Sequence, residues 1–109
     1  MKQRHYALMW DCYGLEAVQE VPDPSLSTFA ALANQPAPVY PNIMHWQLRA
    51  QFNPQRNYEI YVIGTEPDIS AEAIRLSFEA NPQGMADIVR KQGHRFYTNR
   101  RTEQDIKIR

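Results

Sequence analysis

Apolar and polar residues alternate without interruption along residues 44–52. Alternation at period two is typical of a β-strand that has one buried face and one face in water. The apolar positions are Met44, Trp46, Leu48, Ala50 and Phe52, and the polar positions are His45, Gln47, Arg49 and Gln51. Residues 58–63 are rich in β-branched and aromatic side chains and follow a short connection, 53–57. The two segments are therefore predicted to pair as an antiparallel hairpin.

Three more segments have strand-like patterns. In residues 5–12 one alternating set is apolar and the other contains Ala7 and Met9, which predicts a first strand with both faces largely covered. Residues 15–21 form either a second strand or a short helix, because their apolar positions fit both periods. Residues 94–99 are predicted as a final strand.

Capping residues mark three helices. Asp23 followed by Pro24 is predicted to begin a short helix, and Ser70 to begin a helix that runs to residue 80. The dipeptide Asn81-Pro82 ends that helix and begins the next, which Gly93 closes as a C′ glycine. Helical spacing assigns the inward faces to Leu26, Phe29, Ala30 and Ala33, then to Ile69, Ala73, Leu76 and Ala80 with Ile74 and Phe78 beside them, and finally to Met85, Ile88 and Val89.

The order of these elements predicts the fold class. Strands that come in runs separated by helices are typical of an α+β fold. We expect a mainly antiparallel sheet of four to five strands with two to three helices packed on one face. The 109 residues fit a single domain, with residues 100–109 as a frayed basic tail.

Charge is distributed unevenly along a chain whose formal net charge is zero. Residues 90–109 hold seven Lys or Arg against two acids, whereas residues 11–89 hold three Arg against ten acids. A basic end on an acidic body can bind phosphate or an acidic partner, and it can equally be a solvated tail. The solvated tail is the simpler of the two interpretations.

Cysteine and histidine usage argues against several kinds of site. Cys12 is the single cysteine, so an intramolecular disulfide and a cysteine-built zinc site are excluded, and a reducing compartment is indicated. The histidines, His5, His45 and His94, lack the spacing of metal ligands. No apolar run is long enough to span a bilayer. We therefore expect a cytoplasmic protein without metal, cofactor or membrane partner.

The polar side of the predicted sheet is a candidate surface for single-stranded RNA or DNA. Bases stack on aromatic rings while guanidinium groups meet phosphates. The candidate residues are His45, Gln47, Arg49, Tyr61, Arg95 and Tyr97. The register of residues 58–61 is left open, so either Glu59 and Tyr61 or Tyr58 and Ile60 would join this surface.

A catalytic interpretation uses part of the same surface. In a metal-free ribonuclease, His45 would act as general acid or base, Glu59 as its partner, and Arg49 as the group that stabilises the transition state. The residue types are suitable, but no motif fixes them together. Glu59 is more simply a cross-strand partner of Arg49.

The segment from Met44 to Pro67 resembles small proteins of tailed bacteriophages, through its aromatic strands and its closing Thr65-Glu66-Pro67. This resemblance covers about a fifth of the chain, assigns no residue role, and implies a small accessory or host-directed protein. Taken with the absence of a catalytic motif, the sequence favours a non-enzymatic binding protein. Its partner is expected to be another protein, with a sheet edge available for self-pairing. Single-stranded nucleic acid is the alternative partner, and a small ribonuclease is the third interpretation.

Overall fold

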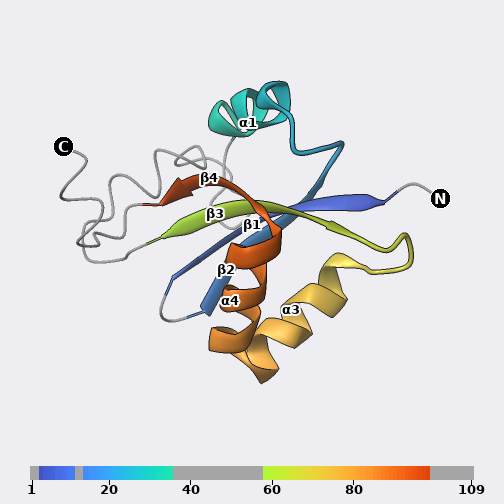
Figure 1. The fold of residues 1–109 in the computed structure, drawn as a ribbon, viewed down its shortest axis with the longest axis vertical. Coiled ribbons are helices and arrows are strands. Elements are labelled where there is room, and N and C mark those ends of the chain that lie inside the picture. Colours follow the sequence, from blue (N-terminus) through green and yellow to red (C-terminus); the bar gives the residue numbers. More distant parts are fainter. Residues whose placement is uncertain (1–2, 12–13, 36–57, 99–109) are drawn as a thin grey trace.

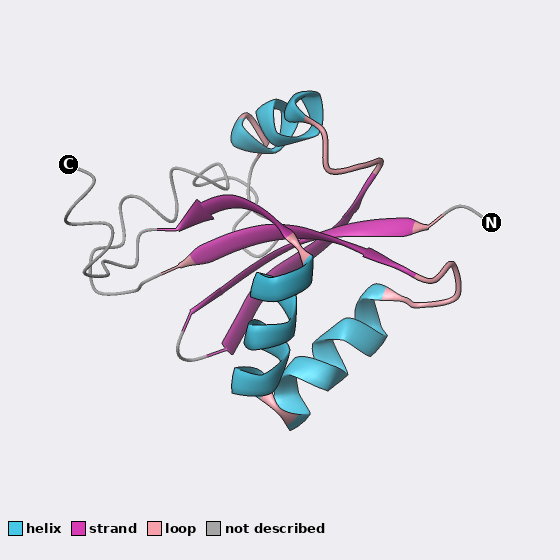
Figure 2. Cartoon of the chain, viewed as in Figure 1, coloured by secondary structure: helices cyan, strands magenta, loops and turns pink. Residues whose placement is uncertain are grey.

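The computed structural model describes residues 3–11, 14–35 and 58–98 (Figure 1). Four strands of this part form one antiparallel sheet in the order β2-β1-β3-β4, and three helices accompany it (Figure 2). The strands are β1 (Arg4–Asp11), β2 (Gly14–Val21), β3 (Glu59–Thr65) and β4 (His94–Thr98), and the helices are α1 (Leu26–Ala33), α3 (Ala71–Ala80) and α4 (Pro82–Gln92). The predicted α+β class is confirmed.

Strand β1 lies inside the sheet, between β2 and β3. Tyr6 through Asp11 are all buried, which confirms the prediction of a strand covered on both faces. Its neighbour β2 is a strand rather than the short helix that the sequence left open. Gly14 begins β2 at a φ of +132°, a conformation that favours glycine at the turn out of β1.

The pairing of β3 differs from the predicted hairpin. One edge of β3 pairs with β1 over its whole length, and the other edge pairs with β4 from Glu59 to Val62. A strand has two hydrogen-bonding edges, and both are occupied along Glu59–Val62. The prediction that these residues pair with residues 44–52 is therefore wrong. Residues 44–52 themselves lie outside the part that the structure describes.

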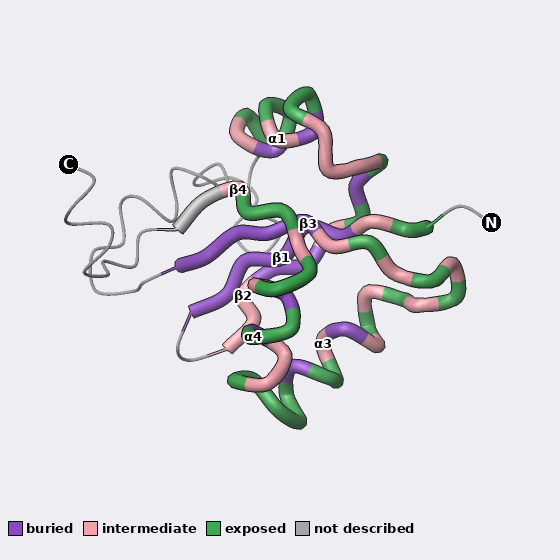
Figure 3. Tube along the Cα trace, in the orientation of Figure 1, coloured by how far each residue is buried: buried purple, intermediate pink, exposed green. Residues whose placement is uncertain are grey.

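The central strands β1 and β3 are largely buried (Figure 3). Each face of the sheet carries its own core cluster. One face contributes Tyr6, Leu8, Trp10, Val18 and Tyr61, which pack against Ile74 and Phe78 of α3 and Ala86 and Val89 of α4. The other face contributes Ala7, Met9, Ala17, Val21, Ile60 and Val62, which pack with Leu32 of α1. Two helices thus share one face, as predicted, while α1 lies on the opposite one (Figure 1).

Helix α1 begins at Leu26, two residues later than predicted. Its N-cap is Ser25, whose hydroxyl oxygen accepts the Thr28 N–H at 3.3 Å, and Asp23 instead accepts the Ser25 N–H at 2.9 Å. This shift changes the inward face to Thr28 and Leu32, with Phe29 partly buried. Leu26, predicted to be inward, is 85% exposed.

The caps of α3 and α4 are those predicted. Ser70 accepts the Ala73 N–H at 3.1 Å, and Asn81 accepts the Gly84 N–H at 3.2 Å with Pro82 in the first helical position. The inward faces differ from the prediction at three positions, because Leu76 and Ile88 are 55% and 48% exposed and Ala80 is exposed as well. The stripe that meets the sheet runs through Ile74 and Phe78 in α3 and through Ala86 and Val89 in α4, and of these only Ala86 was not predicted to face inward.

Gly93 closes α4 by a different geometry from the expected one. It donates its N–H to the carbonyl oxygen of Val89 at 2.7 Å with a φ of −88°, outside the left-handed region that a C′ glycine commonly adopts. Glycine is required here because neighbouring atoms lie too close to leave room for a side chain. A β-carbon at this position would lie 2.7 Å from the Val89 carbonyl oxygen and 3.0 Å from Cγ2 of Ile63.

Candidate functional site

Two adjoining hollows lie where the end of β1 and the start of β2 meet the junction of α3 and α4. The first, of about 270 Å³, is lined by Trp10, Asp11, Gly14, Phe78, Pro82, Gln83, Ala86, Asp87 and Arg90. The second, of about 330 Å³, is lined by Gly14, Leu15, Arg75, Phe78, Glu79 and Pro82. Because they share Gly14, Phe78 and Pro82, we treat them as one feature, the elbow groove.

The local sequence explains why the groove forms at this place. Asn81 ends α3 and caps α4, and Pro82 begins α4 directly, so the chain changes direction without an intervening loop. Ile74 and Phe78 then fix α3 to the sheet while Ala86 and Val89 fix α4. The small side chain of Ala86 and the absent one of Gly14 leave space between the helices and the end of β1.

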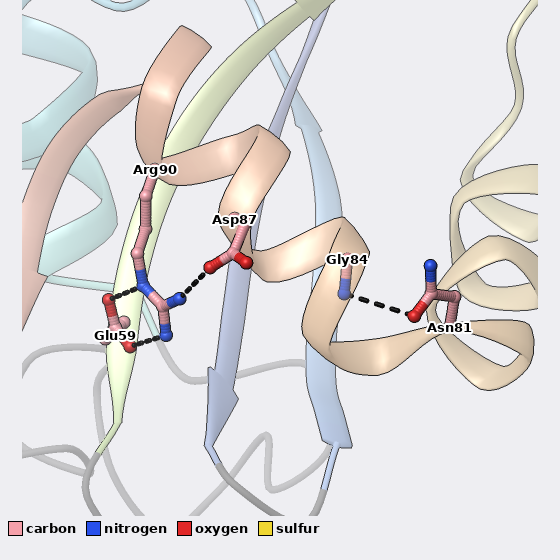
Figure 4. A network of polar contacts seen from close by, with 5 residues as sticks. All are labelled: Glu59, Asn81, Gly84, Asp87 and Arg90. Atoms are coloured by element: carbon pink, nitrogen blue, oxygen red, sulfur yellow. Dashed lines mark hydrogen bonds and ion pairs between the residues drawn. The ribbon is translucent and has the colours of Figure 1, made fainter.

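Arg90 forms one wall of the groove, and its position is fixed by two carboxylates (Figure 4). Its Nε and Nη2 donate to the two oxygens of Glu59 at 2.9 and 2.7 Å, and its Nη1 donates to Oδ1 of Asp87 at 2.9 Å. Hydrogen bonding to Glu59 raises the pKa of Arg90 above its ordinary value, against the opposing effect of burial. Bidentate pairing of this kind fixes a guanidinium both in place and in orientation.

The floor of the groove is an aromatic cluster. Trp10 stacks on Tyr61 with ring centroids 5.3 Å apart, and the Phe78 ring lies 5.7 Å from Trp10 at a tilt of 44°. The guanidinium carbon of Arg90 is 5.9 Å from the Trp10 ring centroid, within range of a cation–π contact. The indole N–H of Trp10 has no hydrogen-bond acceptor among the described residues. Because Trp10 packs against Tyr61, Phe78 and Arg90, the aromatic floor is held in place without a bound partner.

Negative charge predominates around the groove. Among the described residues, Asp11 and Asp87 line the first hollow together with Arg90, and Glu59 pairs with Arg90 from inside the sheet. Asp11 is buried, whereas the Asp87 side chain is 68% exposed at the rim. Across the residues that the structure describes, ten Asp or Glu stand against five Lys or Arg. The described residues are therefore acidic on balance, while the whole chain has a formal net charge of zero.

The six residues predicted to bind nucleic acid are only partly covered by the structure. His45, Gln47 and Arg49 lie outside the described residues. Tyr61 is 8% exposed and packs beneath α3 and α4, so its expected place on an open sheet face is wrong. Its backbone partner Arg95 is exposed on β4. Tyr97 is placed opposite Ile60 by its backbone, and its side chain is outside what the structure describes.

The sequence left open whether Glu59 and Tyr61 or Tyr58 and Ile60 lie on the exposed face of the sheet, and the structure supports neither choice. Tyr58, Glu59, Ile60 and Tyr61 are all buried, because both faces of the sheet are covered at this point. Neither predicted pair of residues therefore joins an open surface. Glu59 pairs with Arg90, whereas His45 and Arg49, its expected partners, lie outside the described residues.

The contact between Glu59 and Arg90 was missed by the sequence reasoning. Arg90 lies in the last turn of α4, where the helix dipole already favours a cation, so its presence there needs no distant partner. The signal was nevertheless present, because Glu59 follows Tyr58 and precedes Ile60 in a segment that is otherwise apolar and aromatic. A carboxylate in such a strand requires a cationic partner when it is buried.

Comparison with known proteins adds no assignment, since neither the family models, nor the curated proteins, nor the solved structures give a match to this chain. The described residues contain no group of three or more His, Cys, Asp or Glu side chains placed to hold a metal ion. Their helices are all too short or too polar to cross a membrane.

Proposed function

We propose that the chain is a small non-enzymatic binding protein and that it holds another protein in the elbow groove. The observation that supports this most directly is the fixed arrangement of Arg90 over Trp10 beside an open hollow. Protein interfaces commonly centre on aromatic and arginine side chains surrounded by a polar rim. Here Trp10 and Phe78 supply the aromatic floor, while Gln83 and Asp87 supply the rim.

The chemistry of the groove favours binding over turnover. General acid or base catalysis needs a titratable group that can take or give a proton to a bound substrate. Glu59 is 3% exposed and both of its oxygens accept hydrogen bonds from Arg90. Arg90 is correspondingly committed to Glu59 and Asp87. Among the described residues that line it, the groove thus offers shape and charge without a group arranged as an acid–base pair.

The alternative of single-stranded nucleic acid has less support in this part of the chain. The carboxylates of Asp11 and Asp87 at the groove repel phosphates, and most nucleic-acid affinity comes from cations that neutralise phosphates. Tyr61, one of the expected stacking residues, is covered by α3 and α4. The role of a small accessory protein, which the resemblance to phage proteins implies, agrees with a binding function in the cytoplasm.

Photo-crosslinking from the rim of the groove tests the proposal. A benzophenone amino acid replaces Gln83, which lines the first hollow, or Glu72, which is exposed in the first turn of α3 and lines neither hollow. Each full-length variant is irradiated in cells of the natural source. We expect a protein adduct from position 83 that position 72 does not give. Equal adducts from both positions, or adducts with nucleic acid alone, would contradict the proposal.

A further inference from the structure

We infer that the partner places an extended segment in the elbow groove, with its backbone amides against α4 and an apolar side chain in the second hollow. This inference rests on the proposed function and specifies the conformation and chemistry of the segment that is held. Three features support it, namely the width of the two hollows, the row of hydrogen-bonding groups that α4 presents, and the apolar lining of the second hollow.

The width of both hollows excludes a helix and admits an extended chain. Their volumes are about 270 and 330 Å³, each equivalent to a cube less than 7 Å on a side. An α-helix with its side chains is about 10–12 Å across, so neither hollow can receive one. Because the hollows share Gly14, Phe78 and Pro82, one extended segment can pass from the first into the second.

Helix α4 lines the first hollow with three polar side chains in a row. Gln83, Asp87 and Arg90 follow one another at the spacing of a single helix face, and all three line the hollow. Seven residues of α-helix rise by about 10 Å, which is the length of about three residues in an extended chain. The row therefore matches a tripeptide segment in length.

The row contains donors and acceptors that the described part of the chain leaves available. A guanidinium has five N–H groups, and the contacts of Arg90 with Glu59 and Asp87 use three of them. Oδ2 of Asp87 accepts no hydrogen bond from the described residues, and the Asp87 side chain is 68% exposed. A backbone peptide group offers one acceptor and one donor, which complement the remaining N–H groups of Arg90 and this oxygen of Asp87. The exposed amide of Gln83 can serve the next peptide group.

The second hollow favours an uncharged, apolar side chain. Leu15, Phe78 and Pro82 supply apolar surface there. Arg75 and Glu79 are the charged residues that line this hollow in the described part of the chain, and their opposite charges lie one helical turn apart. A charged side chain of either sign would therefore meet attraction and repulsion together, whereas an apolar side chain would gain by leaving water.

Titration with capped tripeptides tests each part of the inference. The probes are Ser-Leu-Ser, Ser-Gly-Ser and Ser-Lys-Ser, all acetylated and amidated, and a form of Ser-Leu-Ser in which every amide nitrogen is methylated. Each is added to the full chain labelled with ¹⁵N, and the amide signals of Gly14, Gln83 and Asp87 are followed. We expect the leucine peptide to shift these signals in a saturable manner. The glycine, lysine and methylated peptides should each bind at least about fivefold more weakly, because the first two lose apolar burial and the third lacks backbone donors.

Two substitutions in the groove separate the two kinds of contact. Asp87→Asn keeps an oxygen for Arg90 but replaces the other by an NH₂ group, so it should weaken the leucine and glycine peptides alike and spare the methylated peptide. Leu15→Ala shortens the apolar wall of the second hollow, so it should weaken the leucine peptide and leave the glycine peptide unchanged. The matched controls are Asp68→Asn and Leu26→Ala, at exposed residues that line neither hollow. They should leave binding unchanged, and thermal unfolding should show all four variants to be folded.

Failure of the inference can be separated from failure of the proposed function. The inference would be overturned by no response to the leucine peptide, by equal or tighter binding of any of the other three peptides, or by equal losses from the groove variants and their controls. It would also fail if the partner segment crosslinked at position 83 were helical in the structure of the adduct. In that last case the binding function would stand. Absence of any adduct from position 83 would contradict the function, whereas the peptide titration would still decide which segment the groove prefers.

Discussion

Arg90 on α4 and Glu59 on β3 are joined by two hydrogen bonds of 2.9 and 2.7 Å, although 31 residues separate them in the sequence. The pair fixes the last turn of α4 to the interior of the sheet. Glu59 lies at the paired positions of both Trp10 on β1 and Thr98 on β4, so its carboxylate sits among three strands and a helix. The same guanidinium covers Trp10 and contacts Asp87. One ion pair therefore stabilises the packing of α4 and also shapes the elbow groove.

Removal of one partner should show how much this pair contributes. Arg90→Met leaves the Glu59 carboxylate buried without its guanidinium, and we expect the free energy of unfolding to fall by about 3 kcal/mol. Combining it with Glu59→Gln should recover a large part of that loss, because the uncompensated charge is removed as well. Urea denaturation of the two single variants and the double variant provides the measurement. Additive losses would mean that the two side chains do not depend on each other.

The capping turn of α1 should make stability depend on pH through Asp23. The Ser25 side chain, the Ser25 N–H and the Thr28 hydroxyl hydrogen-bond to the carboxylate and hold the pKa of Asp23 below its ordinary value of 3.8. A carboxyl group whose folded pKa is depressed adds stability above its unfolded pKa, and that stability is lost as the pH falls through the folded pKa. We therefore expect the urea midpoint to fall more steeply between about pH 5 and pH 2 in the wild type than in Asp23→Asn.

The comparison for this prediction is Asp68→Asn, which removes a carboxylate from an exposed turn position. Its acid dependence should match that of the wild type within the error of the midpoints. If Asp23→Asn also follows the wild-type curve, the hydrogen bonds to Asp23 do not favour its ionised form in solution.

Local features of the fold were predictable from the sequence. Ser70 and the dipeptide Asn81-Pro82 act on backbone groups within three residues of themselves, so their roles as caps follow from short-range chemistry alone. The alternation around Trp10 similarly indicates a strand covered on both faces. Information of this kind is contained in neighbouring residues.

Features that depend on distant parts of the chain were not predictable. The sequence predicts that residues 44–52 lie next to β3, yet β3 pairs with β1, and the paired residues are 49 to 61 positions apart. Periodicity reports which residues share a face of a strand, but it does not report which strand lies alongside. The missed contact between Glu59 and Arg90 has the same cause, since only the assembled sheet brings α4 over β3.

The inward face of α3 provides a direct test of its packing. Apolar residues occur on two sides of this helix, so sequence periodicity alone selects Leu76 as readily as Ile74. In the structure Ile74 is buried and Leu76 is 55% exposed. We expect Ile74→Ala to lower the free energy of unfolding by about 2–5 kcal/mol and Leu76→Ala to change it by about 0.5 kcal/mol or less. Urea melts of the two variants measure both values, and a larger loss at Leu76 would reverse the assigned face.

A glycine-to-alanine substitution tests the close approach at the end of α4. A methyl group on Gly93 would lie 2.7 Å from the Val89 carbonyl oxygen, which already accepts the Gly93 N–H, and 3.2 Å from the Val62 carbonyl oxygen in the sheet. Because both are backbone atoms, relief requires movement of α4 or β3 rather than a change of side-chain rotamer. We expect Gly93→Ala to destabilise the fold by about 1–3 kcal/mol, as overpacking does elsewhere.

The matched variant for Gly93 is Gln92→Ala, at the preceding and exposed residue of the same helix. Alanine is the better helix former there, so its effect should stay within about 0.5 kcal/mol. Thermal and urea unfolding of both variants give the comparison. Alanine at position 93 reduces the freedom of the unfolded chain, which by itself would stabilise the protein by about 0.4–1 kcal/mol. A net stabilisation by Gly93→Ala would therefore mean that α4 does not approach the sheet as closely in solution as the 2.7 Å contact requires.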